Sequence, residues 1–312
     1  MSNILIIKHG SLGDLVQISG ALRDIRETYH DQKIFILTTN PYVELLGKCK
    51  YLDGVLIDKR LPRWNFFYLI KLKEMLSKYN FNLVIDLQNS SRTSFYRKFL
   101  FKNIKWNSTE TTLSNGKKKS DFNQISVLKR FEFQLKTLGI KTKYTLKPNF
   151  SWAAINVDNI INRYFGKKFI LFFPFCSPDL PHKKWPHYNL LIDIIKSKHT
   201  NLEIAIAPGP LELEEAKKIN SLVITNNNKS LNISELAGLI KKSSYVIAND
   251  TGPAHMAAHL SKDGTVLFGN HTSAKKVSIE TDIFKAITVE DLKFLSAEKV
   301  YSELKTKLEL IN

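Results

Sequence analysis

Residues 4–14 read ILIIKHGSLGD, an apolar stretch followed directly by a turn that holds two glycines. Residues 4–8 have the length and the apolar content of a buried strand. From Asp14 to Tyr29 the apolar residues recur at helical spacing, so this part of the chain predicts a strand, a tight turn and a helix. Because ligands of open α/β sheets bind at the carboxyl ends of strands, the turn is a first candidate for a binding site.

The same alternation of strand and helix patterns continues along the chain and then starts again. In the first half we predict strands at 33–38, 55–57 and 83–87 and helices at 66–78 and 127–138. In the second half we predict strands at 169–173, 202–207, 245–248 and 265–268, and helices at 188–196, 212–219, 233–241 and 253–259. Strands that alternate with helices indicate parallel βαβ units, here in two tandem domains of the α/β class.

We expect a first domain over residues 1–150 and a second over 151–288, joined by a link within 147–166. Residues 289–312 have helical periodicity and are expected to form a C-terminal helix that packs back on the first domain. The polar segment 107–123 has no apolar period and predicts a mobile loop, with Lys117, Lys118 and Lys119 at its centre.

The net charge of +17 is distributed unevenly. Residues 1–150 hold 26 Lys and Arg against 12 Asp and Glu, whereas residues 151–312 hold 20 against 17. This asymmetry suggests that the first half meets an anionic partner: a membrane surface, a phosphorylated glycolipid or a nucleic acid. The alternative is that a lysine-rich composition has no functional meaning.

No apolar run is long enough to span a bilayer, and the first residues lack the pattern of a secretory signal. We therefore expect a cytoplasmic protein. The two cysteines, Cys49 and Cys176, provide neither a disulfide framework nor a zinc site.

Three segments carry polar residues where a strand ends and a helix begins. In the first, Asp14 is either a helix cap at the positive end of the helix dipole or a functional carboxylate. In the second, Lys183 and Lys184 precede Trp185-Pro186; lysines at such a turn either hold phosphates or are simply solvated.

The third segment reads NDTGPAH over residues 249–255. Its helix begins near Pro253, and the free N–H groups of a first helical turn form a site for a pyrophosphate. Asp250 is placed to accept hydrogen bonds from sugar hydroxyls, and Thr251 to donate to a phosphate oxygen. His255 alone is more often a packing residue than a ligand.

Taken together, these segments resemble glycosyltransferase family 9, the ADP-heptose:lipopolysaccharide heptosyltransferases. The resemblance spans nearly the whole chain, in order, and is far more specific than any single motif. It is carried by Lys8 with Ser11-Leu12-Gly13-Asp14, Asp86-Leu87-Gln88-Asn89, Pro174 with Ser177, Lys183-Lys184-Trp185-Pro186, Gly209 to Glu212 with Ala216, Asn249 to Pro253 with His255, and Leu267-Phe268-Gly269.

The resemblance implies a GT-B fold, in which two Rossmann-like βαβ domains face each other across a cleft. The first domain would bind the acceptor and the second would bind ADP-heptose. The reaction would be an inverting transfer of heptose to the lipopolysaccharide inner core, with no metal ion and no cofactor. The acceptor is an anionic glycolipid, which places the protein in the cytoplasm or at the inner face of the inner membrane.

Site residues also follow from the resemblance. Asp14 would be the general base, with Ser11, Gly13 and the three lysines at 117–119 on the acceptor side. The donor phosphates would be held by Lys183, Lys184, Thr251 and Gly252, the donor sugar by Asp250 and His255, and the nucleoside by Glu212. Cations and helix-end amides aimed at the leaving group lower the barrier, and a carboxylate that faces the acceptor serves as base.

The chain departs from the family pattern at Phe175 and Asn89, where the family has glycine. These departures leave two alternatives open: a transferase that uses another nucleotide sugar for a surface glycan, and a non-catalytic paralogue. The basic composition leaves a third, a nucleic-acid binder. Against the last, the chain shows no helix-turn-helix, zinc-finger or RNP-like aromatic motif.

Overall fold

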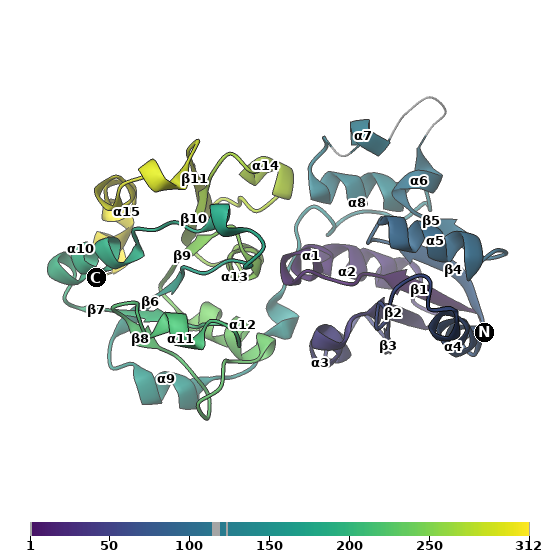
Figure 1. Ribbon diagram of the computed structural model, residues 1–312, viewed down its shortest axis with the longest axis horizontal. Coiled ribbons are helices and arrows are strands. Elements are labelled where there is room, and N and C mark those ends of the chain that lie inside the picture. Colours follow the sequence, from purple (N-terminus) through teal and green to yellow (C-terminus); the bar gives the residue numbers. More distant parts are fainter. Residues whose placement is uncertain (1, 114–118, 123, 312) are drawn as a thin grey trace. The chain divides into compact units, whose positions relative to one another are not determined.

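The structure, a computed structural model, describes residues 2–113, 119–122 and 124–311 (Figure 1). The chain divides into two compact units, Met1–Trp152 and Ala153–Asn312. Each unit is built on one parallel sheet, which confirms the predicted α/β class. Among the helices of the described residues, none is both long and apolar enough to cross a bilayer.

The first unit holds a five-stranded sheet in the order β3-β2-β1-β4-β5. All of its strand pairs are parallel, and β1 lies at the centre between β2 and β4. The chain runs outward from β1 to β3 and then returns to β4 on the other side of β1, so a crevice is expected where β1 and β4 end. The strands are β1 (Asn3–Ile7), β2 (Ile34–Thr38), β3 (Gly54–Ile57), β4 (Phe81–Asp86) and β5 (Lys105–Asn107).

Strand β1 is buried on both faces because helices cover the sheet on both sides. Ile4 and Ile6 pack with α1, α2 and α8, whereas Leu5 and Ile7 pack with α4 and α5. A run of apolar residues without alternation is what such a strand requires. The helices of this unit are α1 (Leu12–Gln17), α2 (Ser19–Thr28), α3 (Val43–Gly47), α4 (Phe66–Ser77), α5 (Ser91–Phe99), α6 (Thr109–Thr112), α7 (Lys119–Phe122) and α8 (Val127–Lys136).

The second unit holds a six-stranded sheet in the order β11-β10-β9-β6-β7-β8. Its pairs are also parallel, and the chain changes direction between β6 and β9. The strands are β6 (Lys168–Phe173), β7 (Leu202–Ile206), β8 (Leu222–Val223), β9 (Tyr245–Asn249), β10 (Gly264–Phe268) and β11 (Phe284–Thr288). The helices are α9 (Asp158–Tyr164), α10 (Tyr188–Lys198), α11 (Leu213–Ala216), α12 (Ile233–Lys242), α13 (Gly252–His259), α14 (Ala274–Val277) and α15 (Ala297–Ile311).

Helix α15 packs within the second unit. Figure 1 shows it beside α10. Val300, Leu304 and Leu308 are buried in the same core as Leu191 and Ile195 of α10. The periodicity predicted the helix, but a stripe of aliphatic residues does not specify which apolar surface it will cover.

The described residues of the segment 107–123 include the end of a strand and two short helices, where the sequence analysis expected a mobile loop. Asn107 ends β5, α6 follows at once, and α7 begins at Lys119. Ser108 caps α6, because its side chain accepts a hydrogen bond from the N–H of Thr111. Lys117 and Lys118 lie outside the described residues.

Candidate functional site

The candidate site of the first unit lies where β1 and β4 end. Lys8 follows β1 and is almost fully buried, and its Nζ lies 3.4 Å from Asp14 Oδ1 and 3.3 Å from the carbonyl oxygen of Leu87. The Asp14 side chain is 38% exposed, so one face of this carboxylate is open to solvent. A buried ammonium therefore holds a carboxylate that a ligand can reach.

Asp14 also acts as a helix cap. Its Oδ2 accepts a hydrogen bond from the backbone N–H of Ser11 at 2.8 Å, while Oδ1 faces Lys8. The two interpretations of Asp14 are thus compatible, because one oxygen fixes the start of α1 and the other lies at the ion pair. Ser11 is the exposed N-cap residue, and Gly13 is buried within α1.

The turn between β1 and α1 requires glycine at position 10. Gly10 has a φ of +116°, and a Cβ atom there would lie 2.5 Å from a ring carbon of Tyr42. Both the backbone angle and the space exclude other residues. This glycine lets the chain turn sharply enough to bring Asp14 beside Lys8.

The candidate site of the second unit is centred on Asp250, which follows β9. Its Oδ2 accepts hydrogen bonds from Lys183 Nζ at 2.5 Å and from His271 Nε2 at 3.0 Å. His255 Nε2 lies 3.8 Å from Oδ1 of the same carboxylate. The structure therefore brings together three residues that the sequence analysis singled out, with His271 as a fourth.

The cluster around Asp250 is buried, and its charges balance locally. Burial alone would raise the pKa of Asp250, but the hydrogen bond and the charge of Lys183, with His255 and His271, hold that pKa below its ordinary value. Burial lowers the pKa of His271, and the hydrogen bond to Asp250 opposes this effect. Asp250 therefore stays ionised and keeps the Lys183 ammonium in place.

Asn249, directly before Asp250, joins the end of β6 to the turn that carries Lys183. It is fully buried, and its Oδ1 accepts hydrogen bonds from the backbone N–H of Trp185 at 3.3 Å and from Tyr188 Oη at 3.1 Å. Its Nδ2 donates to the carbonyl oxygen of Pro174 at 2.8 Å. Asn249 thus fixes the turn that carries Lys183 against the end of β6.

Helix α13 begins one residue after Thr251, its N-cap. Gly252, Pro253 and Ala254 form the first turn; proline has no N–H, so the N–H groups of Gly252 and Ala254 are the ones without a partner within the helix. This helix end directly follows Asp250, so a charged cluster and a helix N-terminus adjoin each other as the motif predicted.

Lys184, unlike Lys183, does not pair with Asp250. Its ammonium pairs with Glu215 on the surface and lies 5.7 Å from the centre of the Phe175 ring. Phe175 is itself buried in the core beside Trp185 and Tyr188. The bulky ring that replaces the family glycine therefore points inward.

Glu212 stabilises the turn after β7. Its Oε2 accepts a hydrogen bond from the N–H of Gly209 at 2.7 Å, and burial raises the pKa of this carboxyl. The predicted helix 212–219 is shortened to α11, with Glu212 as its N-cap.

A cavity of about 430 Å³ opens beside the Asp250 cluster. Its walls come from the turn that precedes α10 and from the ends of β10 and β11. The lining residues are Pro181, His182, Lys184, Gly269, Asn270, His271, Glu290, Asp291, Leu292 and Lys293. The cavity thus lies where parallel sheets of this kind bind ligands, and His271 connects it to Asp250.

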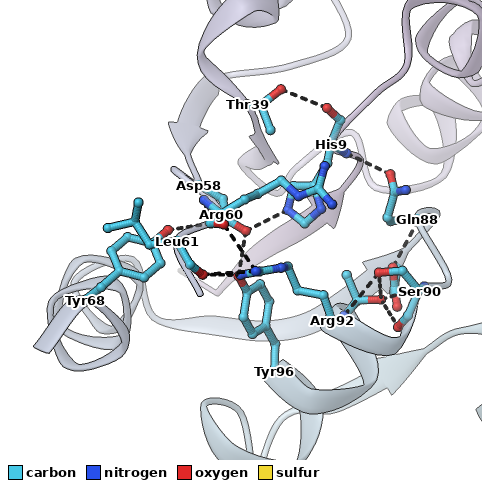
Figure 2. Close-up of polar contacts among 12 residues, drawn as sticks. His9, Thr39, Asp58, Arg60, Leu61, Tyr68, Gln88, Ser90, Arg92 and Tyr96 are labelled. Atoms are coloured by element: carbon cyan, nitrogen blue, oxygen red, sulfur yellow. Dashed lines mark hydrogen bonds and ion pairs between the residues drawn. The ribbon is translucent and has the colours of Figure 1, made fainter. Parts of the chain in front are cut away.

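Sequence reasoning missed two groups of functional candidates. His271 comes shortly after Leu267-Phe268-Gly269, but no spacing linked it to Asp250. In the first unit, His9 Nε2 lies 2.9 Å from Asp58 Oδ2, and both side chains are buried (Figure 2). These partners are far apart in the sequence, so only the fold shows that they meet.

His259, on the buried side of α13, predicts a pH dependence of stability. Burial, with a smaller effect of His255, lowers the pKa of His259 to about 3. Below about pH 6.5 the unfolded chain takes up a proton here that the folded chain does not, so stability falls as the pH decreases. When the pH is lowered from 7 to 5, we expect the unfolding free energy of the wild type to fall by about 2 kcal/mol more than that of His259→Leu. Urea titrations of both proteins at the two pH values measure it, and equal losses would contradict a neutral buried His259.

Within the described residues, no set of three or more His, Cys, Asp or Glu side chains is arranged to hold a metal ion.

Comparison with known proteins gives a consistent result. A family profile described as glycosyltransferase family 9 (heptosyltransferase) matches residues 69–297. Lipopolysaccharide heptosyltransferase 1 of Campylobacter coli is 26% identical over 91% of this chain and 88% of its own length.

Two solved structures share the fold. The Escherichia coli heptosyltransferase WaaC with ADP has a TM-score of 0.73 at 16% identity, covering 97% of this chain and 99% of that one. A family 9 glycosyltransferase from Veillonella parvula has a TM-score of 0.77 at 16% identity, covering 99% and 97%. These likenesses confirm the GT-B fold that the sequence resemblance implied.

Proposed function

The chain belongs to glycosyltransferase family 9, the heptosyltransferases, and from this we propose that it transfers heptose from ADP-heptose to the lipopolysaccharide inner core. We further propose that the transfer inverts the anomeric centre and needs no metal ion. The supporting observation is the place of Lys183, whose ammonium is held by Asp250 directly before the N-terminus of α13.

In this proposal Asp14 removes the proton of the acceptor hydroxyl. The acceptor oxygen forms a bond to C1 of the heptose while the bond between C1 and the diphosphate oxygen breaks. The proton passes to the exposed carboxylate of Asp14, and a single displacement inverts C1. Lys8 orients this carboxylate, because its buried ammonium lies 3.4 Å from Oδ1.

The departing ADP gains negative charge as the bond breaks. Lys183 and the first-turn N–H groups at Thr251 and Gly252 stabilise that charge. Asp250 positions Lys183, and it accepts hydrogen bonds from the sugar with its remaining lone pairs. Lys184 contributes less than Lys183 to binding the phosphates, because its ammonium is paired with Glu215.

Ligands named with related proteins support the choice of donor. One Escherichia coli heptosyltransferase structure carries ADP, and another carries ADP-2-deoxy-2-fluoro heptose. The first unit, with 26 Lys and Arg against 12 Asp and Glu over residues 1–150, suits an anionic glycolipid acceptor. We propose that this unit, with Ser11, Gly13 and residues 117–119, binds the acceptor.

Thermal unfolding in the presence of nucleotides tests the choice of donor. Because a ligand stabilises the state it binds, about 2.7 kcal/mol is gained when its concentration is 100 times Kd. We expect ADP and ADP-heptose to raise the melting temperature, and UDP, GDP and CMP to have little effect at the same concentration. Stabilisation by UDP alone would instead support a transferase that uses another nucleotide sugar.

A further inference from the structure

An exposed apolar surface lies at the start of α4. Trp64, Phe66, Phe67 and Ile70, called here the α4 patch, have exposed fractions of 76%, 69%, 83% and 54%. Ile70 follows Phe66 by four residues and Phe67 by three, so it lies on the same side of the helix as both rings. Leu69, Leu72 and Leu76 occupy the opposite, buried face. The helix is thus apolar on two sides, and only one of them is used by the core.

The surroundings of the α4 patch are basic. Residues 59–73 contain five basic side chains and no acidic one. Lys59, Arg60 and Arg63 precede the helix, and Lys71 and Lys73 are exposed on it. Aromatic rings that extend from a cationic surface fit the interface of an anionic bilayer, where Trp is enriched and nearby Lys and Arg are attracted to the lipid phosphates.

A buried network holds the loop that leads to the patch (Figure 2). Asp58 accepts hydrogen bonds from the Arg60 N–H at 2.7 Å and from Tyr96 Oη at 2.7 Å, and also from Tyr68 Oη. Tyr68 belongs to α4, so the same carboxylate ties the loop to the helix.

The other side of this loop is held by Arg92 of α5. Its guanidinium donates to the carbonyl oxygens of Leu61 at 3.0 Å and Arg60 at 3.2 Å. Burial would raise the pKa of Asp58, but His9, Tyr68 and Tyr96 hold it at about 2. The carboxylate is therefore ionised at neutral pH, and the loop is fixed without any ligand, so docking costs little conformational entropy.

We propose that the α4 patch is a docking surface for an anionic phospholipid bilayer. Its aromatic side chains enter the interface between headgroups and acyl chains, and the surrounding lysines and arginines contact lipid phosphates. The hydrogen bonds of Asp58 and Arg92 to residues 60–61 hold the loop in position for this contact. This inference goes beyond the proposed reaction, and its test uses neither donor nor acceptor.

Vesicle co-sedimentation of the full chain tests the proposal. We expect binding to vesicles of phosphatidylglycerol and phosphatidylethanolamine, little binding to phosphatidylcholine, and weaker binding at high salt. Phe66→Ser/Phe67→Ser, which changes only exposed side chains, should weaken binding about tenfold or more. Lys71→Gln/Lys73→Gln should weaken it by a similar factor. Leu190→Ser/Leu310→Ser is the matched control, because both leucines are exposed apolar residues of the second unit, and it should bind like wild type.

Tryptophan fluorescence reports whether the patch itself enters the bilayer. Of the four tryptophans only Trp64 is exposed, since Trp106, Trp152 and Trp185 are buried or half-buried. Its emission should shift to the blue on binding to anionic vesicles, and Trp64→Phe should bind without the shift. Three results would each overturn the proposal: no binding by wild type, full binding by Phe66→Ser/Phe67→Ser, or binding with unchanged Trp64 emission. Absence of vesicle binding by the wild type would instead favour a protein partner for the α4 patch.

Discussion

We expect Asp14→Asn to lower the turnover number by about 10²-fold or more, while the affinity for ADP stays close to that of wild type. Asparagine has nearly the same shape and still accepts the hydrogen bond from the Ser11 N–H, so the start of α1 is preserved. It cannot take up a proton, however, and it does not pair with the Lys8 ammonium. The predicted donor site lies in the other unit, which explains why binding of ADP should persist.

Steady-state rates with ADP-heptose, together with ADP titrations, measure both effects. Asp31→Asn is the matched control, because Asp31 is an exposed carboxylate of the same unit with no place in the site. It should turn over like wild type. If Asp14→Asn lost melting temperature but kept its turnover, the residue would be a helix cap and nothing more.

The second large effect is expected at Lys183. Lys183→Ala should weaken ADP binding by about 10- to 100-fold and leave adenosine binding nearly unchanged, because a charge-assisted hydrogen bond to phosphate is lost. The substitution also leaves Asp250 buried without its cation, which adds repulsion toward the diphosphate. Calorimetric titration with both ligands gives the two affinities.

Two further variants separate these contributions. Lys183→Ala/Asp250→Asn removes the uncompensated carboxylate, so a loss that persists in it reports the contact between Lys183 and phosphate. Lys184→Ala measures the smaller contribution of the neighbouring lysine: Lys184 also lines the cavity, but its ammonium is paired with Glu215, so ADP affinity should change by less than about threefold. Equal losses for Lys183→Ala and Lys184→Ala would mean that neither ammonium has a special position.

Apart from the edge strand β3, the strands that could be predicted from sequence lie inside the two sheets. Residues 4–7, 169–173 and 245–248 are apolar without interruption, and they form the centres of the two sheets. The edge strands β5, β8 and β11 were missed, because strands of two to five residues with polar positions have no distinctive period. Position in a sheet, more than intrinsic propensity, decided which strands were visible.

Helix boundaries depended on side-chain contacts that periodicity does not encode. The predicted helix from Asp14 to Tyr29 is divided at Ile18 into α1 and α2. Ser19 Oγ donates to the carbonyl oxygen of Val16 at 2.6 Å, which competes with the regular pattern of helical hydrogen bonds. Helix α5 was missed because only Thr93 and Tyr96 of its nine residues are buried.

The same contrast holds for the candidate sites. Asp14, Lys183 and Asp250 were found because each follows a strand and opens a turn or helix, and the structure brings the last two together. Lys184 differs from Lys183 only in where its side chain points, which adjacent positions in a sequence do not reveal. His271 and the His9–Asp58 pair depend on contacts across strands, so they became visible only in the fold.

The central claim is that this chain transfers a heptose from ADP-heptose. The direct measurement is incubation of the full chain with ADP-heptose and a lipopolysaccharide inner-core acceptor that lacks heptose, followed by mass spectrometry of the acceptor and detection of released ADP. We predict that the acceptor gains one heptose for each ADP released, and that Asp14→Asn abolishes most of both signals. An unchanged acceptor, together with transfer from a different nucleotide sugar in the same assay, would contradict the claim.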